Sequence, residues 1–158
     1  MTRPTLARAL RFESLDDILS DAREIAAQPS ASSRGSWTPA QNLWHVGRFI
    51  EAGVEGYPVK VPLVLKLVGP LFKKSFTTKG FKPGVIKLPS AAAEHVVAPA
   101  ETTIETALSK VESAIAGAKE KGFLPRNPMM GKMSQGEWIA LHCRHAEMHF
   151  GLIEWQGA

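Results

Sequence analysis

The sequence contains a single cysteine, Cys143, among 158 residues. One cysteine excludes a disulfide within the chain and a zinc site built from several thiolates. Hydrophobic residues make up 44% and charged residues 22%, which is typical of a globular protein and excludes a collagen, a coiled-coil rod or a wholly disordered chain. The length predicts a single domain over residues 1–158.

Long hydrophobic runs are also missing. The most apolar stretch, residues 59–72, is interrupted by lysine, proline and glycine and is shorter than the ~20 residues that cross a bilayer, so no transmembrane segment is expected. The first residues turn acidic before any apolar run of signal-peptide length, which predicts a cytoplasmic protein. The net charge of +4 is too small to favour nucleic acid as a partner.

Apolar residues do recur with a helical period, in four segments. The expected helices cover residues 14–27, 39–56, 102–122 and 134–155. Each follows a capping pattern, in which a hydroxyl residue precedes an acidic or amide residue by three positions: Ser14 with Asp17, Thr38 with Gln41, Thr102 with Glu105, and Ser134 with Glu137. The pattern predicts an all-α fold, a four-helix bundle with a long connection between helices 2 and 3.

That connection, residues 58–101, contains six prolines and is therefore not expected to form one helix. A helical turn or two is expected around residues 64–76. Because a structureless loop of this length is unusual, we expect the insert to pack across the bundle as a lid or as the surface of a homodimer.

The same insert is basic, with no Asp or Glu between Glu55 and Glu94. Its lysines are Lys60, Lys66, Lys73, Lys74, Lys79, Lys82 and Lys87. Three interpretations remain open: a solvated basic face over an apolar underside, an entrance for an anionic substrate, or peripheral contact with anionic lipid or nucleic acid.

Histidines gather on one face of the last expected helix. At about 100° per residue, His142, His145 and His149 fall on the same side as the apolar Trp138, which predicts that they face the core. Arg144 and Glu147 are expected to point away from that face.

This spacing suits a metal site. His145 and His149 are one helical turn apart and can bind one ion, and a catalytic zinc needs three protein ligands. His45 is favoured over His95 as the third ligand because it also lies on a helix, near Gln41. The residue after His145 is alanine, which disfavours metalloprotease chemistry. A hydrogen-bonded structural cluster remains the alternative.

The chain resembles the DinB-like (YfiT-like) superfamily of small helical bundles, in particular an uncharacterised bacterial branch. Three kinds of segment carry the resemblance: the capped helix of residues 37–46, the closing segment of residues 145–151, and two short motifs, Arg11-Phe12-Glu13-Ser14-Leu15 and Lys87-Leu88-Pro89. The resemblance covers essentially the whole chain.

The resemblance implies a divalent metal, zinc or nickel, held by His45, His145 and His149. Family members of known activity are metal-dependent thiol transferases or mycothiol-dependent isomerases. His142 has no counterpart in that triad; we expect it, with Trp138 and Gln41, to support the ligands or to contact substrate. Replacement of one of the three ligands by His142 remains open. The polar pair usual after the last histidine is replaced by Phe150 and Leu152, a departure that puts the same substrate in doubt.

Two functional hypotheses follow. In the first, the protein is a metal-dependent hydrolase or thiol transferase acting on a small molecule, possible because a three-histidine site leaves a position for a thiol or for water. In the second, it is a non-catalytic bundle whose histidines are structural and whose basic insert binds a partner or an anionic surface. Cys143 is expected to be an inert packing residue in both.

Overall fold

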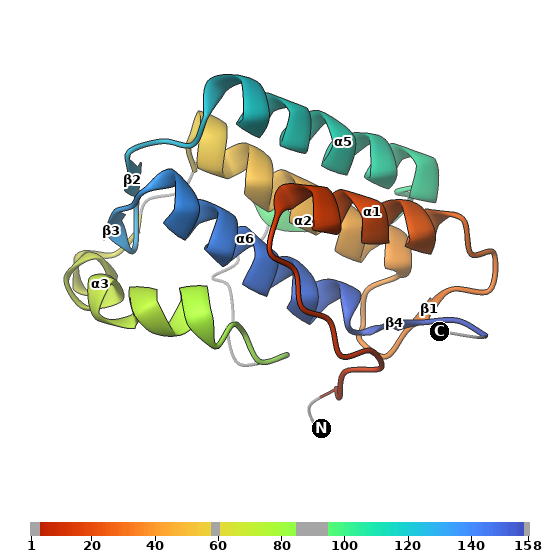
Figure 1. Ribbon diagram of the computed structural model, residues 1–158. Coiled ribbons are helices and arrows are strands. Elements are labelled where there is room, and N and C mark those ends of the chain that lie inside the picture. Colours follow the sequence, from red (N-terminus) through yellow and green to blue (C-terminus); the bar gives the residue numbers. More distant parts are fainter. Residues whose placement is uncertain (1–3, 58–60, 85–94, 157–158) are drawn as a thin grey trace.

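The structure is a computed structural model that describes residues 4–57, 61–84 and 95–156 (Figure 1). It is mainly helical, as the sequence predicts. The helices are α1 (Leu15–Ala26), α2 (Pro39–Glu55), α3 (Leu63–Thr78), α5 (Ile104–Lys121) and α6 (Gln135–Phe150). Two short antiparallel pairs join β1 (Ser32–Ser33) to β4 (Ile153–Glu154) and β2 (Arg126–Asn127) to β3 (Gly131–Lys132). Within the described ranges, no helix is both long and apolar enough to cross a membrane.

The helix starts follow the expected capping chemistry. The side chains of Ser14, Thr38 and Ser134 each accept a hydrogen bond from the backbone amide three residues on, and the side chain at that position accepts one from the backbone amide of the cap residue. These reciprocal bonds satisfy amide groups that have no partner within the helix. The expected cap at Thr102 is wrong by one residue: Thr103 caps α5 through the amide of Thr106.

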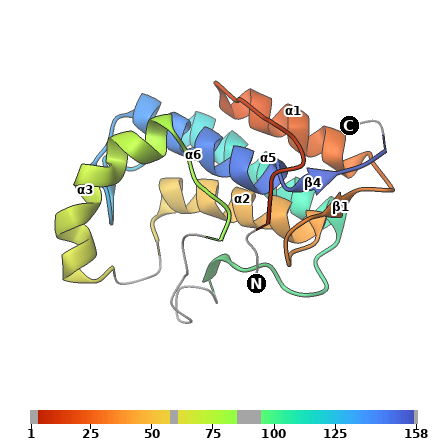
Figure 2. The same ribbon diagram turned by 90° about the horizontal axis from the view of Figure 1, so that it is seen from below.

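Four of the helices, α1, α2, α5 and α6, share one apolar core, while α3 lies outside this group against α6 and β3 (Figures 1 and 2). The predicted apolar stripes provide the core. Its fully buried side chains include Ile18, Ile25, Leu43, Val46, Ile50, Val111, Ile115, Trp138, Leu141 and Phe150. Burying each such aliphatic or aromatic side chain contributes about 1.5–3 kcal/mol.

The insert is not one continuous helix, as its prolines predict, but the helix within it is longer than the one or two turns expected around residues 64–76. A single helix of 16 residues, α3, forms within it, with Pro62 as its N-cap and Pro70 inside. An internal proline removes one backbone hydrogen bond and strains one turn, but it does not prevent a helix whose inner side is packed. Lys60, Lys87 and the motif Lys87-Leu88-Pro89 lie outside the described residues.

The last helix is shorter than expected and ends at Phe150, not near Trp155. The N-terminal segment takes the carbonyl groups that a longer helix would use: Arg8 donates to the carbonyls of Phe150 (3.0 Å) and Ile153 (2.9 Å), and the Ala7 amide donates to Gly151 (2.6 Å). Residues 153–154 instead pair with β1. The end of α6 is therefore set by contacts between the two ends of the chain, and helical periodicity carries no information about such contacts.

Candidate metal centre

Helices α2 and α6 bring three histidines together. His45 lies on α2, and His145 and His149 lie one turn apart on α6. One ring nitrogen from each can be chosen so that all three lie within 4.8 Å of one another, and all three side chains are buried. The predicted triad is therefore assembled from the predicted helices.

Hydrogen bonds orient two of the three rings. His45 Nδ1 lies 2.6 Å from the carbonyl oxygen of Val96, and His149 Nδ1 lies 2.9 Å from Oδ1 of Asn42. Both partners are acceptors, so each Nδ1 carries the proton and each Nε2 keeps its lone pair. A carbonyl or carboxamide oxygen behind the imidazole is the usual support for a metal-binding histidine.

Asn42 is itself held in place. Its amide nitrogen donates to the carbonyls of Thr38 (3.0 Å) and Trp37 (3.3 Å), which turns Oδ1 toward His149. The side chain is 1% exposed. The start of α2 thus fixes the tautomer of a histidine on α6.

The spacing of the nitrogen atoms fits a small cation. Nitrogen ligands about 2.05 Å from a tetrahedral zinc lie about 3.3 Å from each other. His45 Nε2 and His145 Nε2 are 3.2 Å apart. One nitrogen chosen from each of the three rings lies within 4.8 Å of the other two, so a movement of about 1.5 Å or less would bring any pair to the separation that a tetrahedral zinc requires.

The protonation states also fit. Burial lowers the pKa of all three imidazoles, and for His145 the neighbouring His149, His45 and His142 lower it further. Neutral imidazole is the form that binds a metal. Among the described residues, Nδ1 of His145 is buried and has no hydrogen-bond partner, so this ring lacks the support that His45 and His149 have.

An aromatic wall surrounds the triad. Trp37 stacks on His149, with ring centroids 5.6 Å apart and planes inclined by 9°. The ring centroids of Phe49 and His145 are 4.2 Å apart. Phe81, from the segment after α3, makes a T-shaped contact with the same imidazole, with ring centroids 5.4 Å apart. These rings shield the imidazoles from water and strengthen electrostatic interactions inside the site.

His142 faces the core, as expected, but lies apart from the three-nitrogen cluster. The residue is 1% exposed. Its ring stacks on Trp138 with centroids 5.5 Å apart and contacts Phe123 with centroids 4.9 Å apart. Neither ring nitrogen has a hydrogen-bond partner among the described residues, and burial lowers its pKa to about 3. A Cβ on Gly53 would lie 2.9 Å from its Nε2, so glycine is what allows this ring to approach α2.

The other two expected supporting residues have local structural partners. The indole of Trp138 donates to the carbonyl of Leu124 (2.7 Å), and the Gln41 carboxamide accepts from the amide of Thr38 (2.9 Å) in the capping box. A substrate contact for Gln41, Trp138 or His142 stays a prediction. Asn42 and the aromatic wall were not predicted, although Asn42 is separated from His45 and Thr38 by helical spacings that place it near both.

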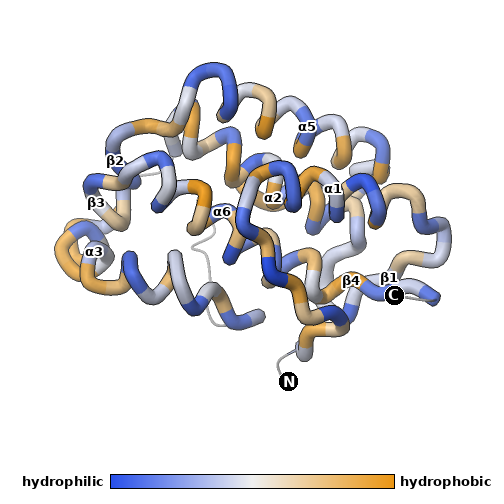
Figure 3. The backbone as a smooth tube through the Cα atoms, in the orientation of Figure 1, coloured by the Kyte–Doolittle hydropathy of each residue, from blue (hydrophilic) through white to orange (hydrophobic). Residues whose placement is uncertain are grey.

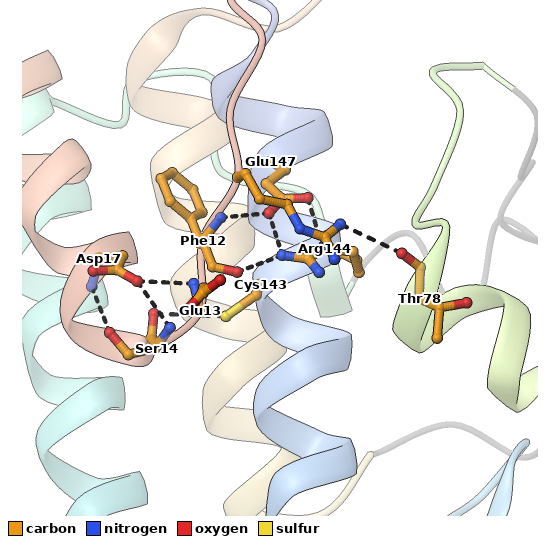
Figure 4. A network of polar contacts seen from close by, with 9 residues as sticks. Phe12, Glu13, Ser14, Asp17, Thr78, Cys143, Arg144 and Glu147 are labelled. Atoms are coloured by element: carbon orange, nitrogen blue, oxygen red, sulfur yellow. Dashed lines mark hydrogen bonds and ion pairs between the residues drawn. The ribbon is translucent and has the colours of Figure 1, made fainter.

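The opposite side of α6 is a structural clamp (Figure 4). Arg144 and Glu147 do lie away from the triad, but Arg144 is buried rather than solvated. The amide of Phe12 donates to Glu147 (2.5 Å), and Arg144 donates to both Glu147 and the Phe12 carbonyl. Nearby, burial raises the pKa of Cys143 to about 11, which suits the expected inert role.

Comparison with known proteins adds a family and no activity. No curated protein and no solved structure matches the chain significantly. A family model described as "Protein of unknown function (DUF1569)" matches residues 5–155. That match covers almost all of the chain, including the three histidines. The chain therefore belongs to the DUF1569 family.

Proposed function

We propose that the protein binds one divalent metal ion, zinc or nickel, through His45, His145 and His149, and that the ion serves a reaction on a small molecule. The observation that carries this proposal is the pair of acceptors behind two of the rings. Val96 and Asn42 hold the Nδ1 protons, so both Nε2 lone pairs are available near His145. A tautomer fixed from behind is what a metal ligand requires.

When bound, such an ion supplies Lewis acidity that lowers the pKa of a thiol or of water, and three protein ligands leave a position for one of them. The chain's own groups orient the ligands and exclude water. Asn42 and the Val96 carbonyl fix two imidazoles, while Trp37, Phe49 and Phe81 cover the rings. A hydrolase or a thiol transferase is compatible with this arrangement.

We also propose that α1, α2, α5 and α6 are the four helices of a DinB-like bundle. The support is the order of the ligands, one histidine from the second bundle helix and two from the last. Phe150 and Leu152 are buried in this chain, at 0% and 6% exposure. They therefore pack in the core, and the substrate is expected to differ from that of relatives with polar residues there.

The non-catalytic alternative keeps one argument in its favour, because a hydrogen bond between His45 and His145 would hold the two helices together without a metal. It does not account for the acceptors behind His45 and His149, which turn two Nε2 lone pairs toward the same region. Only one of these lone pairs can accept the single Nε2 proton of His145, whereas a cation can take all of them. The buried Nδ1 of His145 has no partner among the described residues in either case.

Metal content tests the proposal directly. The untagged full-length protein is prepared without nickel or chelator, loaded with zinc or nickel, desalted and measured by elemental analysis. We expect one equivalent in the wild type and none in His145→Ala. The matched control is His95→Ala, since His95 is the exposed histidine on the described part of the insert.

Thermal unfolding gives an independent readout. At a metal concentration 100 times the dissociation constant, a ligand that binds only the native state adds about 2.7 kcal/mol of stability. The wild type and His95→Ala should gain this stabilisation, and His145→Ala should not. Failure of the folded wild type to take up either metal at micromolar concentration would refute the metal site and leave the structural alternative.

A further inference from the structure

Helix α3 presents an apolar face to the outside of the molecule. Six of its hydrophobic side chains are between 36% and 80% exposed, which is the reverse of the usual distribution. They are Leu63, Val64, Leu67, Val68, Leu71 and Phe72, and we call them the α3 apolar face. Exposed apolar patches that are contiguous in this way mark sites of interaction.

The face is continuous because its residues follow helical spacing. Leu63, Leu67 and Leu71 form one row at four-residue intervals, and the remaining three form a second row beside it. The hydropathy colouring of Figure 3 shows this concentration in the first half of α3, at the edge of the molecule.

The opposite side of α3 packs against the rest of the protein, and these contacts determine which side of the helix faces solvent. Gly69 is buried, and a Cβ there would lie 2.2 Å from the carbonyl oxygen of Met129. Lys73 forms an ion pair with Glu137 (2.7 Å) at the start of α6. Phe76 stacks on Phe81 at 4.9 Å. These contacts fix which side of the helix faces outward.

Charge restricts the partner. Residues 61–84 contain five lysines and no acidic residue. Apart from Lys73, these lysines are exposed: Lys66, Lys74, Lys79 and Lys82. Arg126 and Lys132, on the β2–β3 hairpin beside α3, are exposed as well. The partner must therefore be negatively charged where it meets this end of the molecule.

Two candidate partners satisfy only half of these requirements. In a symmetric dimer of this chain the same patch would meet itself, which would bring lysines opposite lysines. A nucleic acid would complement the charge but would leave the leucine rows without an apolar environment. An anionic lipid surface offers both acyl chains for the apolar rows and headgroups for the lysines.

We propose that α3 is a membrane-docking helix, which lies in the plane of an anionic lipid surface with the α3 apolar face inserted. A 16-residue helix is about 24 Å long, so it fits within the interface without crossing the bilayer. This inference goes beyond the proposed metal site and is independent of it.

Co-sedimentation of the full-length protein with vesicles tests the inference. Binding to mixed phosphatidylcholine–phosphatidylserine vesicles should exceed binding to phosphatidylcholine alone and should weaken as salt is added. The double variant Leu67→Glu/Leu71→Glu should lose at least about tenfold in partition coefficient, because two charges must then enter the acyl boundary. Lys74→Gln and Lys79→Gln should each lose about fivefold.

Matched controls separate the face from exposure in general. Leu6 is 43% exposed outside α3, so Leu6→Glu should bind vesicles like the wild type. Lys121 is exposed at the end of α5, outside α3, so Lys121→Gln is the control for the lysine variants and should also bind vesicles like the wild type. Circular dichroism confirms that each variant is folded.

Three results would overturn the proposal. The first is a folded wild type that stays in the supernatant with the anionic vesicles. The second is a dimer, detected by light scattering, that Leu67→Glu/Leu71→Glu dissociates, because a second copy would then cover the face. The third is salt-dependent binding of a fluorescent oligonucleotide that the lysine variants abolish and the leucine variant does not.

Discussion

Helices α6 and α3 depart from the usual distribution of polar and apolar residues in opposite directions. Helix α6 turns His142, His145 and His149 into the interior, at 1–7% exposure. Helix α3 turns two rows of leucine, valine and phenylalanine toward solvent. The two helices contact each other, so both departures occur on adjoining elements.

Both departures cost free energy in the isolated chain. Buried imidazoles lose their hydration, and exposed leucines gain nothing from folding. In our proposals a ligand relieves each cost, a metal ion for α6 and a lipid surface for α3. A buried polar or exposed apolar residue is more informative when several of its neighbours share the same departure. His145 and His149 form one cluster with His45, and six exposed side chains form one face of α3. A single exposed leucine such as Leu6 needs no explanation.

Truncating one leucine on each helix should have a large effect on stability in α6 and almost none in α3. Leu141 of α6 is 0% exposed, and Leu141→Ala should lower the free energy of unfolding by about 2–5 kcal/mol because it leaves a cavity. Leu71 of α3 is 80% exposed, and Leu71→Ala should change it by no more than about 0.5 kcal/mol. Urea unfolding measures both.

A large loss of stability in Leu71→Ala would contradict the exposed position of this leucine. A loss of more than about 1 kcal/mol is outside the range of ordinary surface substitutions and would mean that another part of the chain covers the leucine. The α3 apolar face would then be interior, and the membrane-docking proposal would fail with it.

The core helices were predictable because their signals are local. Ser14, Thr38 and Ser134 cap the helices that the periodicity indicates, and apolar stripes at helical spacing become the core. In the insert the position of the helix was predicted but its length was underestimated, since Pro70 is accommodated inside α3. What stabilises α3 is its packing on Met129 and α6, a tertiary effect that a residue pattern does not contain.

In the candidate site, too, the residues set by local spacing were predictable and those that come from distant segments were not. Helical spacing and the family resemblance were enough to select His45, His145 and His149, which the structure brings together. The Val96 carbonyl could not be selected, because it comes from a distant segment and any residue type supplies a carbonyl. Phe81 likewise reaches His145 only through the path of the chain after α3.

Asn42 gives a prediction of intermediate size on the α6 side of the comparison. Asn42→Leu removes the acceptor for the Nδ1 proton of His149, so the tautomer and ring orientation are no longer fixed. Loss of such a partner typically weakens metal binding by about 10–100-fold. A competition titration with a chromophoric chelator measures the affinity.

Asn42→Asp is the matched control, because it keeps an acceptor oxygen near His149 while losing the donor to Thr38 and Trp37. Its zinc affinity should stay closer to that of the wild type than the affinity of Asn42→Leu. Equal affinities for Asn42→Leu and the wild type would show that the hydrogen bond is structural and does not support a ligand.

His142 tests whether every buried histidine of α6 belongs to the metal site. Its ring nitrogens have no described partner, and its neighbours are Trp138, Phe123 and Phe49. Replacing an unpaired buried polar group by an apolar one of similar volume is nearly neutral, so His142→Leu should shift the unfolding free energy by less than about 1.5 kcal/mol. Bound metal should remain at one equivalent, as measured by elemental analysis. A variant that folds but has lost the metal would instead identify His142 as a ligand, in place of one of the three that the Nε2 geometry favours.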